Sequence, residues 1–438
     1  MIYLKCNDLK ISYILILFFF MSSVSAQKIL TIDDAINITL KNNFDILVAA
    51  NDANISKVNN SLGNAGILPT FAVTASGNLE QSNVKQKLSS GSDNNIPSLS
   101  TTSLSAGAQL NWNLLDGGKM FVTKSKLNEI QALGEIQFKE KVMQTIFDLI
   151  AAYYDLVRQK QQLNSIVEVS NYNRERVTIL QAGFKAGSML KSDLLMAKID
   201  LNVSSESIIN QKYTISATVK TLKQLLGRID DEPIEISDSI PLNYTINKAE
   251  LLLKINNSNS SILGFNKQIE IAQLALKESK SMYLPSFIFK AGYYLSHTVN
   301  SDGQVLQNNA VGPQIGGTLV IPIYSAGETK RKVNIAKIQV KSAEYDLQST
   351  KLQVNTAFEN SLSDFENQQL LLKIENENNE LAKENLRISL DRLRLGQATA
   401  LEVRLAQQDF VQSCTRLINF SYNLKIAETR LKQLVSAL

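Results

Sequence analysis

The hydrophobic positions of this chain recur every seventh residue in two segments that lie 209 positions apart. The segments cover residues 194–225 and 403–434, and both end in the tetrapeptide Leu-Lys-Gln-Leu. The heptad positions are Leu194, Leu201, Ile208, Ile215 and Leu222 in the first segment, and Val403, Phe410, Leu417, Leu424 and Leu431 in the second. This pattern predicts one helical unit used twice, so we divide the mature chain into structural repeats 27–245 and 246–438.

Each repeat begins with a helical segment that ends at a Leu-Pro pair. Residues 32–68 follow Thr31 and include Asp33 and Asp34, which favour a helix N-terminus. In residues 249–282, apolar side chains again recur every seven residues. Because proline disfavours a helical residue before it and cannot donate the next hydrogen bond, we expect both helices to end there.

After each proline the period changes from seven to two, which predicts β-strands. The alternating runs lie at about 70–80, 103–115, 286–297 and 311–324. Each run has roughly the ten residues that a tilted strand needs to cross a bilayer. The connectors at 81–102 and 299–309 are rich in polar residues, so we expect loops there.

A long segment without proline and almost without glycine follows each strand pair, at 117–183 and at 326–392. A helix of about 65 residues would be roughly 100 Å long, far beyond the mean for globular domains. We therefore expect a coiled coil or the wall of a helical tube. Each long helix ends at a short glycine-containing break, and helices 192–226 and 399–435 should then return antiparallel.

The first 26 residues lie outside the repeat. Lys5 and Lys10 precede an apolar run, and the stretch ends in a small-x-small pattern before Gln27. These features are typical of a signal peptide that is removed on export. Because residue 27 is not cysteine, we expect no lipid-modified N-terminal cysteine.

Composition excludes several classes of function. The chain has 45 Lys and Arg residues against 41 Asp and Glu, dispersed along its length, which does not suit a nucleic-acid surface. One His and, after export, the single Cys414 leave no material for a His/Cys metal site or a Cys/His catalytic pair. The carboxylates recur on solvated helix faces rather than as a glycosidase pair. We expect no enzymatic activity, no cofactor and no metal.

Four amphipathic strands per chain cannot close a membrane barrel, since known barrels begin at about eight strands. Open sheet edges are not tolerated in lipid, where each unpaired backbone group costs several kcal/mol. Further copies of the chain must therefore complete the barrel, and the charged helices must extend into the aqueous compartment. Trp112 and Tyr324 lie at the strand–helix junctions, where we expect membrane-interface aromatics. The predicted fold class is an α+β membrane protein.

The conjunction of tandem halves, a Leu-Pro before each strand pair and a recurring signature resembles the TolC-type outer-membrane efflux proteins. The signature is Gly-x₅-(Asp/Glu)-x₃-Ala, and it occurs as Gly187, Asp193 and Ala197 and as Gly396, Glu402 and Ala406. The resemblance covers residues 28–438. It implies a homotrimer in the outer membrane of a Gram-negative cell, with a 12-stranded β-barrel and an α-helical periplasmic tunnel. It also implies docking to a periplasmic adaptor (membrane fusion) protein and, through it, to an inner-membrane transporter.

The resemblance assigns adaptor docking to the two helix breaks. The tip residues are Lys185, Ala186, Gly187, Ser188, Arg394, Leu395, Gly396 and Gln397. Considered without the family, the two glycines are ordinary helix-terminating residues.

The resemblance also makes Asp193 and Glu402 gate-region acids, whose carboxylates would form a ring at the constriction. Without the family, they are acids in the first turn of a helix, where the dipole favours negative charge. The pattern departs from the family at two positions: Leu405 replaces a second acid and Ala398 replaces a latch arginine. The nearby arginines, at positions 392, 394 and 404, are candidate substitutes.

Two classes of function remain. The chain is either a passive export duct for a multipartite efflux or type I secretion system, or a structural or adhesive surface protein with a coiled-coil stalk. The period-two strand pairs favour the duct, since a stalk needs no strands of bilayer length. A wholly soluble coiled-coil scaffold is a third reading, opposed by the signal peptide and the alternating runs.

Overall fold

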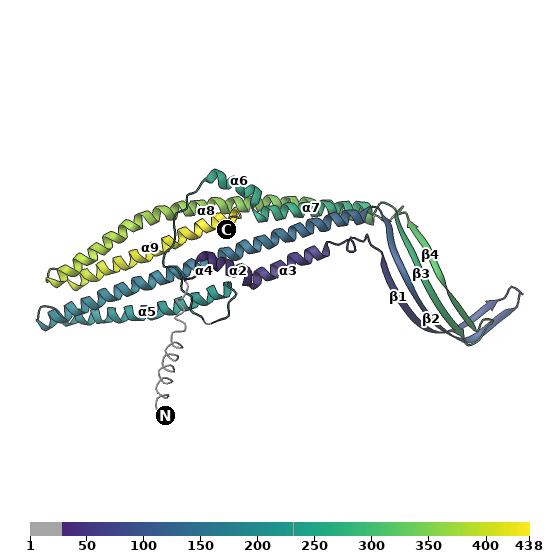
Figure 1. Cartoon of the computed structure of the whole chain (residues 1–438), viewed down its shortest axis with the longest axis horizontal. Coiled ribbons are helices and arrows are strands. Elements are labelled where there is room, and N and C mark those ends of the chain that lie inside the picture. Colours follow the sequence, from purple (N-terminus) through teal and green to yellow (C-terminus); the bar gives the residue numbers. More distant parts are fainter. Residues whose placement is uncertain (1–28, 231) are drawn as a thin grey trace, which may run out of the picture.

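The computed structural model describes residues 29–230 and 232–438, and the predicted signal peptide, residues 1–26, lies outside them. The molecule is elongated, with helices along most of its length and a sheet at one end (Figure 1). Within the described ranges, no helix combines the length and the apolar character that a membrane crossing requires.

The second half of the chain repeats the element order of the first: two short helices, two strands, a 67-residue helix and a 35-residue helix. The elements are α2 (Ile32–Asn42), α3 (Phe44–Asn59), β1 (Thr70–Lys87), β2 (Asp93–Asp116), α4 (Lys119–Lys185), α5 (Lys191–Leu225), α6 (Lys248–Ser258), α7 (Ser260–Ser281), β3 (Ser286–Asn300), β4 (Gln307–Val320), α8 (Glu328–Arg394) and α9 (Ala400–Leu434).

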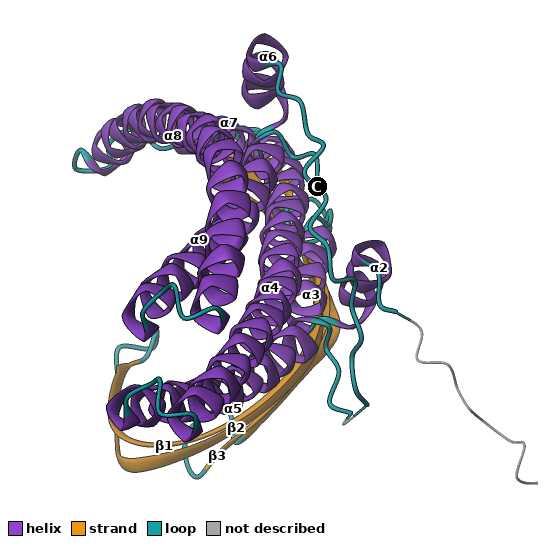
Figure 2. Cartoon of the chain, turned by 90° about the vertical axis from the view of Figure 1, so that its left-hand side faces the viewer, coloured by secondary structure: helices purple, strands orange, loops and turns teal. Residues whose placement is uncertain are grey.

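The long helices and their returning partners are confirmed. Helix α4 packs against α5, and α8 packs against α9. Both long helices begin after a glycine in the left-handed conformation, Gly118 with φ of 79° and Gly327 with φ of 78°. Seen along the molecule, the helices form a curved wall, with α2 and α6 on its convex side (Figure 2).

The first helix of each repeat is interrupted, which the heptad pattern did not predict. The segment predicted at 32–68 breaks at Asn43 and its helical part ends at Asn59, and the segment at 249–282 breaks at Asn259. Asparagine favours such breaks because its side chain can satisfy backbone groups that a continuous helix would pair.

The two asparagines are equivalent in their contacts. The Asn43 amide oxygen accepts from the N–H of Ile46 at 3.2 Å, and its amide nitrogen donates to the Leu225 carbonyl at 2.8 Å. Asn259 repeats both contacts, at 3.1 Å within its own helix and at 2.9 Å to the Leu434 carbonyl. Each asparagine therefore caps the helix that it precedes and also binds the end of the returning helix.

The predicted loop at 81–102 is wrong for most of its length, because β1 continues to Lys87 and β2 already begins at Asp93. These extensions pair with each other in register, apart from an irregularity between Ser82 and Val84. A hairpin needs only its backbone groups to pair, and alternation of apolar residues is required only where one face contacts lipid. The polar composition of residues 81–102 therefore led to the prediction of a loop where the chain forms a β-hairpin.

The strand predicted at 311–324 is wrong at both ends. Strand β4 already begins at Gln307, within the predicted loop 299–309, and it ends at Val320. Pro322 follows two residues later, and it cannot donate a ladder hydrogen bond, so the chain leaves the sheet before it.

The four strands form one antiparallel sheet in the order β1-β2-β3-β4. Each strand pairs with its neighbours in sequence order, so the two repeats meet at the β2–β3 ladder. Strands β1 and β4 each have one edge that no other described strand covers.

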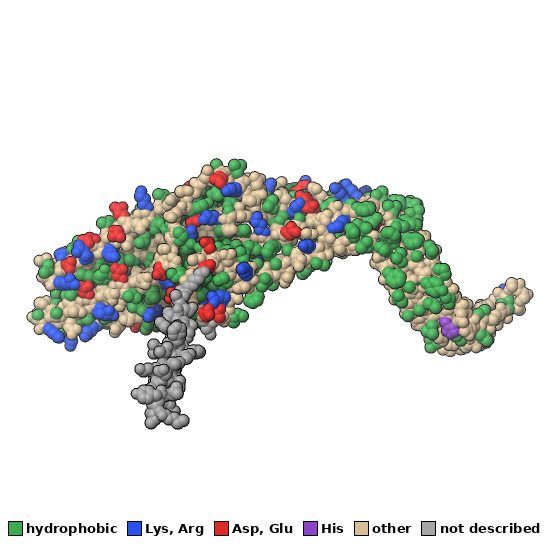
Figure 3. Space-filling view, viewed as in Figure 1, with side chains coloured by type: hydrophobic (Ala, Val, Ile, Leu, Met, Phe, Trp, Pro, Cys, Tyr) green, Lys and Arg blue, Asp and Glu red, His purple; other side chains and the backbone are tan. Residues whose placement is uncertain are grey.

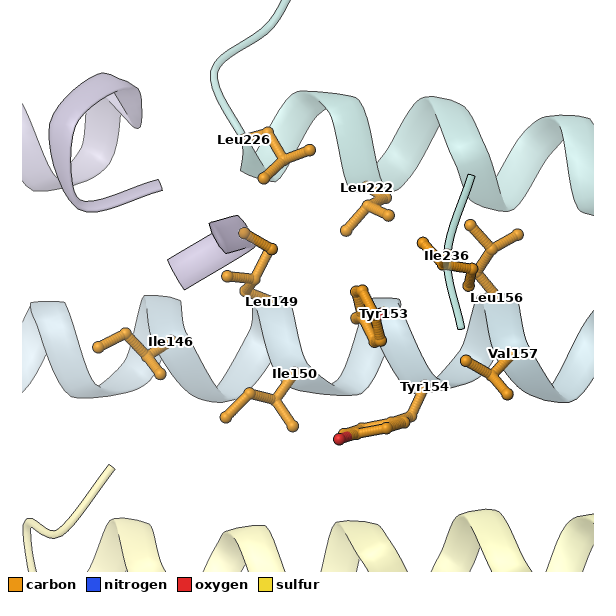
Figure 4. Close-up of a cluster of buried hydrophobic side chains, with 11 residues drawn as sticks. Ile146, Leu149, Ile150, Tyr153, Tyr154, Leu156, Val157, Leu222, Leu226 and Ile236 are labelled. Carbon is orange, nitrogen blue, oxygen red and sulfur yellow. The ribbon is translucent and has the colours of Figure 1, made fainter. Parts of the chain in front are cut away.

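The main buried cluster lies where α4 passes the end of α5 (Figure 4). Leu149, Leu156 and Leu222 are fully buried there. The segment around Ile236 crosses this cluster, and its neighbour Glu235 accepts a backbone hydrogen bond from Leu30 at 2.7 Å. Two further clusters join α8 to α9, one near α6 and α7 and the other near the far turns, so the helical wall has apolar packing along its length.

Candidate functional site

One face of the sheet is apolar. The register aligns Phe71, Leu110, Ala291 and Ile315 across the four strands, so these residues and those at even spacings from them share a face. Phe71, Val73, Leu79, Ile315 and Leu319 on this face are between 58% and 74% exposed. In Figure 3, hydrophobic side chains gather over the part of the sheet next to the helices.

The opposite face of the sheet is polar. Its residues include Thr74, Ser76, Asn78, Ser103, Ser105, Gln109, Ser296, Thr298 and Gln314. A sheet with one apolar and one polar face suits a wall between lipid and water, which is the arrangement of transmembrane barrels with an aqueous interior.

The polar face also carries Tyr294, whose ring lies over glycine. A Cβ on Gly107 would lie 2.6 Å from the Tyr294 ring, and a Cβ on Gly292 would lie 2.8 Å from it. Both distances are far below van der Waals contact, so only glycine permits this ring position. The tyrosine therefore lies along the wall instead of projecting from it.

The helical wall has open edges that match those of the sheet. Helix α3 contacts α4, α4 contacts α7, and α7 contacts α8, so α3 and α8 are the outer helices of this layer. Both carry exposed apolar side chains at helical spacings, of four, seven and three residues on α3 and of three and seven residues on α8. These are Phe44, Val48, Ile55 and Val58 on α3, and Ile335, Ile338, Tyr345 and Leu352 on α8.

The two predicted interface aromatics lie at the helical end of the sheet. Trp112 is in β2, and its indole N–H donates to the Ile67 carbonyl at 3.0 Å. Tyr324 is 88% exposed and lies in the connection after β4. Their role at a membrane interface stays a prediction.

The eight predicted tip residues are all exposed; Lys185 and Arg394 are the last residues of α4 and α8, and the other six lie in the turns α4–α5 and α8–α9. Both turns lie at the end of the molecule opposite the sheet (Figure 1). Gly187 and Gly396 have φ of 75° and 72°. The residue after each glycine donates to a carbonyl five positions earlier, at 2.9 Å for Ser188 and 2.8 Å for Gln397. The turns are thus a matched pair of Schellman motifs.

Asp193 and Glu402 occupy the first turns of α5 and α9. Asp193 is half-buried and Glu402 is exposed. The Glu402 N–H donates to the Thr399 hydroxyl at 3.2 Å, which begins the helix. Within residues 29–230 and 232–438, neither carboxylate forms an ion pair. No described residue therefore neutralises the charge of either carboxylate by an ion pair.

A buried polar cluster joins α4 to α5 and α9 near this end. Arg176 is 2% exposed; its guanidinium pairs with the Asp200 carboxylate and donates to the Gln407 amide oxygen at 3.1 Å. Gln407 in turn donates to the Asn173 amide oxygen at 2.9 Å. We call these four residues the buried quartet. It links the two repeats, and sequence analysis did not find it.

The three candidate arginines have different partners. Arg394 pairs with Glu175, which links α8 to α4. Arg404 lies 3.4 Å from the Asp200 carboxylate, which links α9 to α5. Arg392 donates to the carbonyl of its own turn at 3.0 Å. Two of the three therefore connect the first helical pair to the second.

A further link joins these pairs between Lys383 on α8 and Glu168 on α4, at 3.4 Å. The Glu168 carboxylate raises the pKa of Lys383 above its usual value. Burial raises the pKa of Tyr172, with the Glu168 charge adding to it. Lys383 therefore stays protonated and Tyr172 stays neutral at neutral pH.

Comparisons with known proteins find similarity to outer membrane efflux proteins and to a secretion protein. A family model described as outer membrane efflux protein matches residues 35–228 and 251–437. The chain is 22% identical over 335 residues to the outer membrane efflux protein BepC of Brucella suis, covering 74% of this chain and 70% of that one. It is 19% identical over 399 residues to the proteases secretion protein PrtF of Dickeya chrysanthemi, covering 89% and 84%.

The fold is similar to that of a solved structure, the outer membrane protein VceC of Vibrio cholerae. The TM-score is 0.74 with 14% sequence identity, over 92% of this chain and 96% of that chain. A likeness at this identity shows the fold, and it confirms the predicted combination of barrel strands with long tunnel helices.

Proposed function

Because this chain belongs to the outer membrane efflux protein family, and is therefore a channel component of the outer membrane, we propose that three copies form a duct. The duct docks a periplasmic adaptor and, through it, an inner-membrane transporter. The observation that carries this proposal is the four-stranded sheet, apolar on one face and polar on the other, whose outer edges on β1 and β4 no other described strand covers.

Barrel geometry supports three copies over two. Two copies would supply eight strands, and barrels of about eight strands have interiors that side chains fill. Three copies supply twelve strands and leave an aqueous lumen. The same closure brings the exposed row on α3 of one copy against the row on α8 of the next. Barrel and helical tube then close together. A stalk would need neither the sheet faces nor these edges.

The turns at Gly187 and Gly396 are the proposed docking surface. The eight predicted tip residues are exposed, and they lie as far from the sheet as the chain reaches. We expect Gly396→Glu to abolish export by living cells while trimers still form, because the change adds bulk and charge at the turn. Gly396→Asn is the matched control, since asparagine tolerates the left-handed conformation.

Asp193 and Glu402 are the proposed constriction acids. The duct and these acids are tested together by single-channel recording in planar bilayers. We expect the wild-type protein to conduct with a preference for cations, and Asp193→Asn with Glu402→Gln to conduct with that preference reduced. No conductance from the wild type would contradict the duct. Unchanged selectivity in the double variant would contradict only the role of the acids.

A further inference from the structure

Three connections between the sheet and the helices share one arrangement of side chains. In each, an exposed aromatic residue lies next to the sheet and a lysine lies three to six residues further away. The pairs are Phe121 with Lys124 in α4, Tyr283 with Lys280 at the end of α7, and Tyr324 with Lys330 in α8. The three aromatic side chains are 60%, 51% and 88% exposed.

Two more lysines extend this pattern along the helices. Lys277 lies three residues from Lys280, and Lys337 lies seven residues from Lys330. These spacings place each pair on one side of its helix, and all four side chains are exposed. We call Lys124, Lys277, Lys280, Lys330 and Lys337 the basic belt. Basic side chains border the apolar sheet in Figure 3.

The belt is not neutralised by the described part of the chain. Lys277, Lys280, Lys330 and Lys337 form no ion pair with any residue of 29–230 or 232–438, and Lys124 bonds only to amide oxygens, those of Asn60 and Asn128.

The carboxylates at the same level already have partners. Glu278 pairs with Lys126, and Glu328 pairs with Lys332 at 2.7 Å. Asp116 accepts from the N–H of Met120 at 3.0 Å. An excess of positive charge is therefore exposed next to the apolar sheet.

The depth of the belt matches that of lipid phosphates. Three to four residues of helix span roughly 5 Å, and a lysine stem extends along apolar surface while its ammonium seeks polar surroundings. Aromatic rings favour the boundary of the hydrocarbon core. The ammonium groups of Lys124 and Lys280, each one turn beyond its aromatic ring, would then lie in the headgroup layer.

We propose that the basic belt binds the phosphate groups of anionic phospholipids in the periplasmic leaflet. This inference rests on the proposed function, which embeds the sheet in the membrane with the helices in the periplasm. The lipid chains would contact the apolar face of the sheet, and the headgroups would contact the lysines.

The test uses the full-length protein reconstituted in vesicles of phosphatidylcholine mixed with phosphatidylglycerol. After mild detergent extraction, native mass spectrometry counts the lipids of each kind that stay bound. We expect the wild type to retain phosphatidylglycerol in preference. Lys280→Gln with Lys330→Gln should lower that preference, by roughly fivefold per lysine, and the corresponding arginine variants should preserve it.

The matched control is Lys351→Gln with Lys373→Gln, which removes the same charge from exposed positions of α8 far from the sheet. Equal retention of both lipids by the wild type would overturn the proposal that the basic belt binds anionic phospholipids. So would a control variant that loses the preference as much as the belt variant does. Conductance in pure phosphatidylcholine separates the two proposals. Normal conductance of the belt variant in this lipid would leave the duct proposal standing. No conductance from the wild type would contradict the duct proposal itself.

Discussion

At the scale of single residues, glycines in this sheet leave room for aromatic rings. Gly107 and Gly292 lie under Tyr294 on the polar face, and Gly317 lies under Phe287 on the apolar face, where an added Cβ would be 2.7 Å from the ring. The alternation that predicted the strands distinguishes apolar from polar positions. It carries no information on where a ring lies, so these contacts could not be predicted.

Gly107→Ala should narrow the lumen. The new methyl group displaces the Tyr294 ring from the wall, and overpacking of this kind typically costs about 1–3 kcal/mol. We expect lower single-channel conductance, restored when Tyr294→Ala is added. Gly312→Ala is the control, because it lies on the same face with nothing within 4 Å of its Cβ. Equal conductance of Gly107→Ala and wild type would contradict this prediction, because it would show that the Tyr294 ring can move without narrowing the lumen.

The buried quartet was also not predicted, because the sequence pattern does not show which distant side chains meet. Asn173 precedes Leu180 by seven residues, and Gln407 follows the buried Ala406, so polar residues interrupt two apolar stripes. Such interruptions indicate a buried polar contact, but the partners come from helices more than 200 residues apart. One sequence does not specify that pairing.

At the scale of elements, periodicity predicted the helices well because no proline and only isolated glycines, such as Gly134, lie within their long apolar stripes. It failed at Asn43 and Asn259, where the stripe continues across the break. The cause of each break is a hydrogen bond to a helix about 180 residues away. Local pattern determines which segments are helical, and long-range contacts determine where they bend.

The contact between α4 and α7 joins the two repeats and should depend on pH. The Glu129 carboxylate lies 2.7 Å from the Lys267 ammonium, and this hydrogen bond lowers the pKa of the Glu129 carboxyl below its usual value. A lowered pKa stabilises the fold above the unfolded value, and that stabilisation is lost as the pH falls through the folded value.

Glu129→Gln should therefore lower the thermal midpoint at pH 7, corresponding to about 0.5 kcal/mol for such a partly exposed pair. The difference from wild type should shrink as the pH falls through the lowered pKa of Glu129, because below it the wild-type side chain is neutral, as glutamine is. Glu384→Gln, which removes an ion pair within one helix, controls for the loss of charge. A difference that persists in acid would assign the effect to packing.

At the scale of the whole molecule, the exposed rows on α3 and α8 are what a closed tube needs to bury. Ile338→Glu places a carboxylate in the proposed seam, where burying an isoleucine contributes about 2 kcal/mol. We expect the trimer to dissociate in native mass spectra while helix content by circular dichroism is retained. Leu253→Glu, on the projecting helix α6 and 70% exposed in the single chain, is the matched control. If Ile338→Glu trimers were as stable as wild-type trimers, the proposed contact between α3 and α8 of neighbouring copies would be wrong.

The extended β1–β2 hairpin has a consequence for symmetry. The turns that contain Gly187 and Gly396 are nearly equivalent, so three copies would present six similar turns at the periplasmic end. The hairpin runs to Lys87 and Asp93 in the first repeat, whereas β3 and β4 stop at Asn300 and Gln307. The outer mouth would therefore have only threefold symmetry. A partner that meets the turns encounters a quasi-sixfold surface, while one that meets the mouth can occupy three sites at most.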